Sequence, residues 1–148
     1  LLIRTSNLKG TTVEGAVIPA LIDEIPMIAV MAAFADGTTV IRDAQELKVK
    51  ESDRITVMVE NLKRMGADIR VEGKLAIIDG VNSLIGAHVK ATDLRAGAAM
   101  IIAGLMAEGT TEITDIYHID RGYENFEEKF VKLGGSIERV QVVDDLLD

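Results

Sequence analysis

Two stretches of the chain repeat one pattern of apolar and polar residues. Residues 32–43 read AAFADGTTVIRD and residues 103–115 read AGLMAEGTTEITD, with their Gly-Thr-Thr triplets 72 residues apart. Each stretch is followed by a charged segment that ends in a similar way, LKRMGADI at 62–69 and VKLGGSI at 131–137. A repeat of about 70 residues predicts one supersecondary unit that is used twice.

The first half of the first unit combines a short strand with an apolar helix. Residues 10–19 alternate enough to predict a strand that ends at its proline. Asp23 stands where an N-cap is expected, and Pro26 suits the first helical turn because its missing amide hydrogen would have had no partner there. The run 27–35 is apolar on every side, which is typical of a buried helix.

The rest of this unit, which covers residues 11–80, alternates β-branched segments with one amphipathic helix. A strand is predicted over 38–42, and after a loop a helix opens at Glu51, with apolar residues at helical spacing, and ends at Gly66. Two strands follow, at about 67–72 and 75–79, joined by a Glu-Gly turn. The unit therefore reads β-α-β-α-β-β.

The second unit, residues 86–148, repeats this order. Its predicted elements are a strand at about 87–90, an apolar helix capped by Thr92 or Asp93, a strand over 110–114, an amphipathic helix over 123–133 and a strand over 136–141. In common α/β folds the sheet is the apolar centre and the helices carry a polar outer face. Neither unit's first helix has such a face, so we expect a single α/β domain over 1–148 with these helices inside and the sheets outside.

Composition narrows the class of protein. A chain of 148 residues with 48% apolar residues and 3% aromatics is long enough for one domain with an aliphatic core. A formal charge of −8 argues against binding nucleic acid or an anionic membrane, because both need a basic face. The chain has no cysteine, which excludes a disulfide framework and a thiol nucleophile and favours a cytoplasmic location. The longest apolar runs are too short to span a bilayer.

Charged residues recur at the helix starts of both units or in the loops before them. They are Asp23, Glu51, Arg54, Asp93, Arg95 and Arg121. In βα units these ends face one way, so the side chains could converge on one surface. Helix N-termini favour an anion, and arginine forks suit a phosphate or carboxylate better than lysines do.

Structural explanations remain open for several of these residues. Asp23 and Asp93 could be plain N-caps, a role that does not exclude catalysis. Glu51 and Arg54 could form an exposed helix pair that contributes only a few tenths of a kcal/mol. Arg95 is harder to explain in this way, because it sits on an otherwise apolar helix and must reach the surface or hold an anion.

At this point the residues resemble the enolpyruvyl transferase family. Residues 8–55, with the segments IDEIP and KVKESDRI, resemble the C-terminal half of 5-enolpyruvylshikimate-3-phosphate synthase, and the resemblance extends over about 1–58. Over about 62–141, the segments LKRMGADIRVEGKLAIIDGV, ATDLRAGAAMIIAGLMAEGTTEI and IYHIDRGYENFEEK resemble UDP-N-acetylglucosamine enolpyruvyl transferase. The chain thus reads as a hybrid with its seam near 55–64, or as a divergent or designed family member.

The resemblance implies a reaction and a fold. These enzymes transfer the enolpyruvyl group of phosphoenolpyruvate to a hydroxyl of shikimate 3-phosphate or UDP-N-acetylglucosamine and release phosphate, without a metal or organic cofactor. Their domains are inside-out α/β barrels of three β-α-β-α-β-β units with buried helices, of which this chain would carry two.

The resemblance also assigns roles to individual residues. Asp23 matches the aspartate that contacts and deprotonates the acceptor hydroxyl, and Glu51 matches the glutamate that shuttles a proton on the methylene carbon. The positions that match the phosphate and carboxylate contacts of phosphoenolpyruvate are Arg54, Arg95 and Arg121, with Lys50 and Asp93 beside them.

Two departures from the shikimate enzyme leave the acceptor open. Leu94 stands where that enzyme has histidine, and Arg121 stands where it has lysine. The family's other domain is missing, so we expect a fragment that is inactive alone, with an exposed helix face that favours a homodimer. The alternative is an engineered hybrid or shortened chain, made to test folding, with no ligand at all.

Overall fold

The first unit forms a four-stranded sheet with helices packed on one face. The computed structural model describes residues 1–43 and 54–141. The strands are β1 (Thr12–Val13), β2 (Thr38–Ile41), β3 (Asp68–Glu72) and β4 (Leu75–Asp79), in the spatial order β1-β2-β4-β3. β1 is parallel to β2, whereas β4 is antiparallel to both of its neighbours. Helices α1 (Val17–Ala20), α2 (Ile25–Ala33) and α3 (Arg54–Arg64) complete the unit.

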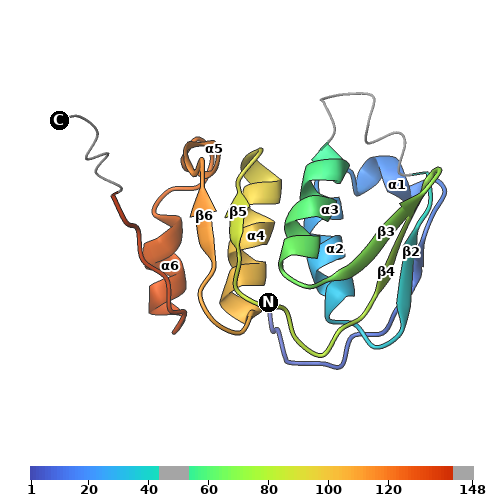
Figure 1. Cartoon of the computed structure of the whole chain (residues 1–148), viewed down its shortest axis with the longest axis horizontal. Coiled ribbons are helices and arrows are strands. Elements are labelled where there is room, and N and C mark those ends of the chain that lie inside the picture. The colour runs from blue at the N-terminus through green and yellow to red at the C-terminus, as the bar shows by residue number, and fades with distance from the viewer. Residues whose placement is uncertain (44–53, 142–148) are drawn as a thin grey trace.

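The second unit stacks against these helices. Its elements are β5 (His88–Lys90), α4 (Leu94–Met106), β6 (Glu112–Thr114), α5 (Tyr117–Asp120) and α6 (Phe126–Lys132), and β5 pairs with β6 in parallel. Figure 1 shows α2 and α3 beside the four-stranded sheet, then α4, then β5 and β6, and α6 outermost. The predicted mixed α/β fold is confirmed, and α2 and α4 lie between the two sheets.

The repeat is visible in the backbone. Gly10 N donates to Asp36 O at 2.8 Å, and Gly86 N donates to Glu108 O at 2.7 Å. A Cβ built on Gly10 would lie 2.3 Å from the carbonyl oxygen of Thr38, and one built on Gly86 would lie 2.2 Å from that of Thr110. Only glycine permits an approach this close, and the chain uses it at equivalent places shortly before β1 and β5.

Small side chains allow the two apolar helices to pack closely. Ala29 and Ala33 of α2, and Ala99 and Ala103 of α4, are each 0% exposed. From α3, the predicted apolar positions Met58, Val59 and Leu62 are buried in the same cluster. The separation between packed helices depends on the side chains at the contact, so these alanines account for the close pairing of α2 and α4.

A buried polar side chain of the first unit forms a hydrogen bond with the second unit. Asn61 of α3 is 3% exposed, and its side-chain amide donates to the carbonyl oxygen of Lys90 at 2.9 Å. A buried amide without a partner would be costly, so this bond fixes α3 against β5. Nothing in the helical periodicity of α3 predicted that contact.

The predicted strand over 10–19 is only partly correct. Its strand is limited to Thr12–Val13, and Val17–Ala20 forms the short helix α1, which contains Pro19. Gly15 adopts a left-handed φ of 70° and accepts a hydrogen bond from Ile18 N, so the chain turns into a helix before the proline. Proline is tolerated in a first helical turn because its missing amide hydrogen has no partner there.

Two predictions for the end of the second unit are wrong. The amphipathic helix begins at Phe126 and not at residue 123, after Asn125 in a left-handed conformation (φ 48°), and the short helix α5 precedes it. Residues 136–141 form no strand. In the first unit β3 hydrogen-bonds only to β4, and within the described residues the second unit has no counterpart of β4. The expected homodimer stays a prediction.

Candidate active site

The predicted helix starts lie at one end of the molecule. In Figure 1 the N-terminal ends of α3 and α4 are at the top, and α5 lies near the top on the α4 side. A Cβ built on Gly122 would lie 2.7 Å from the side chain of Leu94, so the chain just after Arg121 packs on the first turn of α4. This packing places the backbone next to Arg121 at the helix end that carries Asp93 and Arg95.

Asp93 is the N-cap of α4. Its Oδ1 accepts hydrogen bonds from the backbone N–H groups of Arg95 at 3.0 Å and Ala96 at 2.8 Å. An aspartate in this place satisfies two amides that have no partner within the helix. The capping role expected of Asp93 is confirmed, and it fixes the turn from which the Arg95 side chain projects.

The same expectation for Asp23 is wrong. The N-cap position of α2 is Glu24, and no side chain caps this helix. Glu24 N and Ile25 N both donate to Leu21 O, at 2.9 and 3.0 Å. Because a preceding turn already satisfies these amides, the helix needs no side-chain cap, and the Asp23 carboxylate is left for another contact.

That contact is with Arg95 of the other unit. Arg95 Nη2 lies 3.2 Å from Asp23 Oδ2, and both side chains are about half exposed, at 46% and 45%. The two residues are 72 positions apart, which is the period of the repeat, so equivalent positions of the two units carry opposite charges and meet. The 72-residue spacing of Asp23 and Arg95 therefore indicates this pair in the sequence, although the charge pattern alone did not predict it.

Part of the predicted site lies outside the described residues. Lys50 and Glu51 both do, and so does the side chain of Arg54, whose backbone begins α3. Within residues 1–43 and 54–141, no group of three or more acidic or histidine side chains could hold a metal ion. The helices found there include none with the length and apolarity to cross a membrane.

A separate hollow lies elsewhere in the described residues, and its charge does not suit an anion. It has a volume of about 1180 Å³ and lies between β6, α6 and residues 134–140. Among the described residues that line it, the charged ones are Glu112, Asp120, Glu127, Glu138 and Arg139. Four carboxylates against one guanidinium repel a phosphate or carboxylate ligand. Neither Asp23 nor Arg95 lines this hollow.

The cap of α4 gives a stability prediction. Asp93→Ala is expected to lower the free energy of unfolding by about 1 kcal/mol, because two amides lose their acceptor. Asp93→Asn should cost much less, since its amide oxygen can still accept both hydrogen bonds. Urea denaturation of the three proteins checks this, and equal losses for alanine and asparagine would contradict the capping role.

A second prediction concerns acid stability. Arg139 donates to Asp120 at 2.8 and 3.0 Å and to Glu127 at 2.8 and 3.1 Å, and these hydrogen bonds lower the pKa of both carboxyls. A carboxyl whose pKa is lower in the folded state than in the unfolded state stabilises the folded state at pH values above the ordinary pKa of about 4. This stabilisation is lost as the pH falls through the lowered pKa values.

Arg139→Gln should therefore lower the free energy of unfolding by about 1 kcal/mol at pH 7. This is at the upper end of the range for exposed ion pairs, because Arg139 makes bidentate contacts. The difference from the parent chain should shrink below about pH 4, as the two carboxyls become protonated. Denaturation of both proteins at a series of pH values measures this difference in the free energy of unfolding. A difference that is constant from pH 7 to pH 2 would contradict the stabilising role of the Arg139 ion pairs.

The comparisons with known proteins agree with this fold. The chain belongs to the enolpyruvyl (carboxyvinyl) transferase family. The family model that matches residues 2–130 is EPSP synthase (3-phosphoshikimate 1-carboxyvinyltransferase).

Relatives carry the names of both enzymes. The chain is 46% identical over 142 residues to UDP-N-acetylglucosamine 1-carboxyvinyltransferase of Finegoldia magna, covering 96% of this chain and 32% of that protein. It is 48% identical over 134 residues to 3-phosphoshikimate 1-carboxyvinyltransferase of Brevibacillus brevis, covering 90% of this chain and 32% of that one. The chain thus spans about a third of the length of these relatives. The seam near 55–64 stays a prediction.

Solved structures show the same fold. EPSP synthase from Acinetobacter baumannii matches with a TM-score of 0.78 at 34% identity, over 85% of this chain and 30% of that one. The enolpyruvyl transferase NikO from Streptomyces tendae matches with a TM-score of 0.65 at 27% identity, over 88% and 28%.

Proposed function

We propose that this chain contributes half of the substrate site of an enolpyruvyl transferase. The enzyme would move the enolpyruvyl group of phosphoenolpyruvate to an acceptor hydroxyl and release inorganic phosphate, with a partner domain supplying the remaining contacts. The acceptor would be shikimate 3-phosphate or UDP-N-acetylglucosamine. With half of its site, the chain alone would bind ligand weakly and turn over little, because catalysis needs both sides of the substrate to be held.

The observation that supports this proposal is the pair formed by Asp23 and Arg95. An acid from one unit and an arginine from the other lie 3.2 Å apart at the N-terminal end of α4. Their half exposure leaves both groups accessible to a ligand. A phosphate or carboxylate beside Arg95 would also lie near the positive end of the α4 dipole.

In the proposed reaction, the acceptor hydroxyl adds to C2 of phosphoenolpyruvate. Asp23 takes the hydroxyl proton as the new C–O bond forms, and Glu51 delivers a proton to the methylene carbon C3. The C–O bond to phosphate then breaks, the leaving phosphate takes up the proton held by Asp23, and Glu51 removes a proton from C3 to restore the double bond. Addition and elimination thus need an acid and a base with separate surroundings.

The remaining residues would bind the anionic groups. Arg95 and Arg121, on the same end of the second unit, would hold the phosphate and carboxylate, with Arg54 and Lys50 approaching from the first. Guanidinium groups so placed stabilise charge that builds up on the leaving phosphate. Asp93, as the cap of α4, positions the turn that carries Arg95.

Titration with phosphoenolpyruvate, followed by amide chemical shifts, tests the proposal. We expect saturable shifts at residues 23–25 and 94–96, and weaker binding of inorganic phosphate, which has no carboxylate. A rise in melting temperature with phosphoenolpyruvate should accompany them. Shifts confined to other regions, or no response at millimolar ligand, would refute the proposal and favour a folded chain that binds no ligand.

A further inference from the structure

A buried side chain of α5 belongs to the turn that carries Arg121. Ile119 is 2% exposed and lies in a second, smaller apolar cluster beside the main core. Its carbonyl oxygen accepts hydrogen bonds from Gly122 N at 3.1 Å and from Tyr123 N at 3.0 Å. These two amides come directly after Arg121, so a shift of Ile119 moves the backbone from which the Arg121 side chain projects.

The side chain of Ile119 packs on a glycine of α4. A Cβ built on Gly97 would lie 2.7 Å from Ile119 Cγ1 and 3.1 Å from its Cδ1, and 3.0 Å from the Cβ of Ala91. Because apolar carbons pack at about 3.5–4.0 Å, only a residue without a Cβ lets Ile119 approach the helix this closely. Gly97 is buried in the opening turn of α4, two residues after Arg95.

The contact between the two turns is reciprocal. Leu94, the residue before Arg95, packs against Gly122, the residue after Arg121, and a Cβ built on Gly122 would lie 2.7 Å from Leu94 Cδ2 and 2.8 Å from its Cδ1. Each arginine therefore has a neighbour in sequence that contacts the turn of the other arginine. The backbone positions of Arg95 and Arg121 are fixed relative to each other by these contacts.

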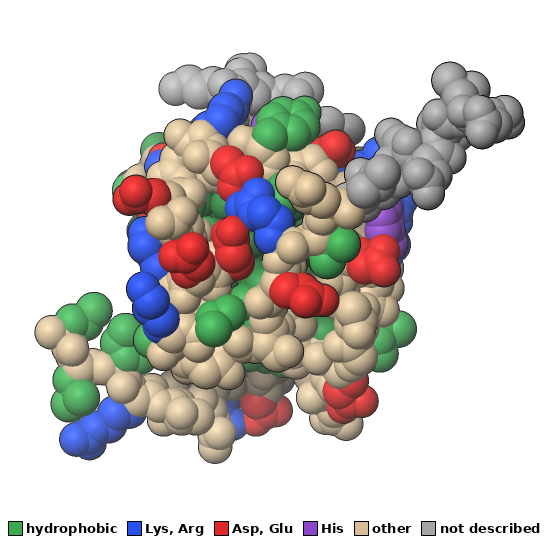
Figure 2. All heavy atoms as spheres, turned by 90° about the vertical axis from the view of Figure 1, so that its left-hand side faces the viewer, with side chains coloured by type: hydrophobic (Ala, Val, Ile, Leu, Met, Phe, Trp, Pro, Cys, Tyr) green, Lys and Arg blue, Asp and Glu red, His purple; other side chains and the backbone are tan. Residues whose placement is uncertain are grey.

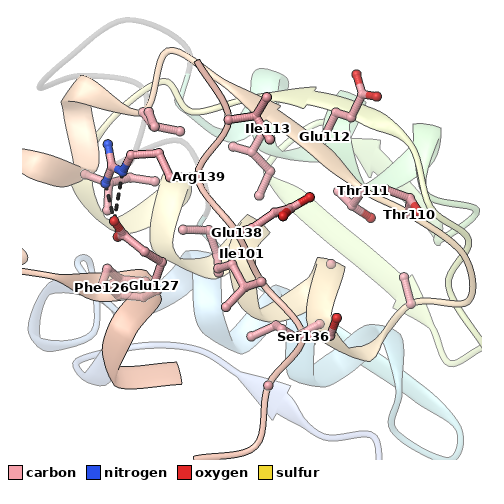
Figure 3. Close-up of a pocket in the computed structure, with 18 of the residues that line it drawn as sticks. Ile101, Thr110, Thr111, Glu112, Ile113, Phe126, Glu127, Ser136, Glu138 and Arg139 are labelled. Atoms are coloured by element: carbon pink, nitrogen blue, oxygen red, sulfur yellow. Dashed lines mark hydrogen bonds and ion pairs between the residues drawn. The ribbon is translucent and has the colours of Figure 1, made fainter. Parts of the chain in front are cut away.

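An ion pair also holds α5, on the surface of the molecule. Figure 2 shows acidic side chains gathered around basic ones near the middle of the face that carries the second unit. Arg139 binds Asp120 of α5 and Glu127 of α6, and Figure 3 shows its contact with Glu127. The side chains of Arg139 and Asp120 are 39% and 43% exposed, and exposed pairs contribute little. The buried contact of Ile119 therefore dominates the placement of α5.

We propose that Ile119, packed on Gly97, is a positioning residue that sets the separation of Arg95 and Arg121 for a ligand with two anionic groups. This inference rests on the proposed function, in which the arginines hold the phosphate and the carboxylate of phosphoenolpyruvate. A ligand with one anionic group needs only one of the two arginines, so its binding depends less on their separation. The contact should govern the preference for phosphoenolpyruvate over inorganic phosphate.

Calorimetric titration of the whole chain with each of these two ligands tests the proposal. In Ile119→Ala, phosphoenolpyruvate affinity should fall by about tenfold, the equivalent of one charge-assisted hydrogen bond. Inorganic phosphate affinity should change by less than about twofold, because Arg95 alone can hold one anionic group. Gly97→Ala should act in the same direction by pushing Ile119 away from α4. The double variant should lose no more than the weaker-binding single variant, because both changes act through one contact.

Two control variants separate positioning from stability and from the surface pair. Ile69→Ala is the matched core change, because Ile69 of β3 is also 2% exposed and lies in the first unit. It should lower the urea midpoint and keep the preference for phosphoenolpyruvate over phosphate. Arg139→Gln should also keep this preference, since it removes only the surface pair. Circular dichroism shows whether each variant is folded, and Gly97→Ala provides the test if Ile119→Ala is not.

Hydrogen exchange without ligand distinguishes this inference from the proposed function. The amides of Gly122 and Tyr123 should exchange at least about tenfold faster in Ile119→Ala than in Ile69→Ala, because the turn that holds them loses its buried contact. Faster exchange combined with a parent chain that binds no phosphoenolpyruvate would refute the proposed function, and with it the role toward the ligand, but would support Ile119 as the anchor of the turn.

Three results would overturn the proposal directly. The first is unchanged exchange of the two amides in Ile119→Ala. The second is an equal loss of affinity for phosphoenolpyruvate and for inorganic phosphate in that variant. The third is a loss of the preference between the two ligands that is as large in either control variant as in Ile119→Ala.

Discussion

Gly80→Ala is expected to destabilise the chain by about 3 kcal/mol or more, the largest loss that we predict for a single substitution. A Cβ built on Gly80 would lie 1.6 Å from the carbonyl oxygen of Ala35, and the neighbouring Val81 N donates to Ala33 O at 2.8 Å. The chain leaving β4 is thus held against the end of α2, and backbone meets backbone. No side chain can rotate away to relieve the clash.

Gly73→Ala is the matched control for this prediction. Gly73 turns between β3 and β4 with φ 58°, and a Cβ there would meet no atom within 4 Å. Alanine at Gly73 should cost about 1 kcal/mol from its left-handed backbone alone. Urea denaturation measures the free energy of unfolding of both variants. A loss for Gly80→Ala no larger than that for Gly73→Ala would show that the chain after β4 and the end of α2 separate easily.

Arg95→Ala should weaken phosphoenolpyruvate binding by about 10- to 100-fold, because a charge-assisted hydrogen bond contributes about 1.5–3 kcal/mol. Asp23→Asn should have the opposite effect on affinity. In the free chain the carboxylate of Asp23 neutralises Arg95, and removing that charge leaves the guanidinium available to the anion. Isothermal calorimetry with phosphoenolpyruvate measures both variants.

Arg64→Ala is the control for the charge change. Arg64 is exposed at the last residue of α3, at the far end of that helix from the site. Its removal should leave phosphoenolpyruvate affinity within about twofold, since exposed charges farther apart than a Debye length of about 8 Å are largely screened. Equal losses of phosphoenolpyruvate affinity for Arg64→Ala and Arg95→Ala would show that binding depends only on the net charge of the chain. That result would contradict a specific contact with Arg95.

The buried helices were predictable because their sequences are apolar. The apolar run before Gly37 and the one before Gly109 have no polar face, which favours burial, and α2 and α4 lie between the sheets. The burial is not complete on every side, because Met31 and Met106 are about half exposed. The cap at Asp93 and the left-handed glycines Gly66 and Gly73 were predictable for a related reason. Each depends on residues within one turn of itself.

The contacts of the site were less predictable. Asp23 and Asp93 have the same residue type at the start of an apolar helix, yet only Asp93 caps its helix. The difference comes from the turn before α2, whose Leu21 carbonyl already satisfies the first amides. The Asp23 carboxylate then meets Arg95 because the two units stack, and that depends on the packing of α2 against α4.

By itself, the sequence determined the repeat, the elements of the first unit from β2 onward, and the family, since these follow from residue identity and local periodicity. The tertiary structure alone decided three other features: the Asp23–Arg95 pair, the close approach of Gly80 to α2, and the absence of a strand at residues 136–141. Each depends on which distant segment lies alongside. A β-strand in particular forms its hydrogen bonds with a neighbour, so its sequence can favour an extended backbone but cannot supply the partner.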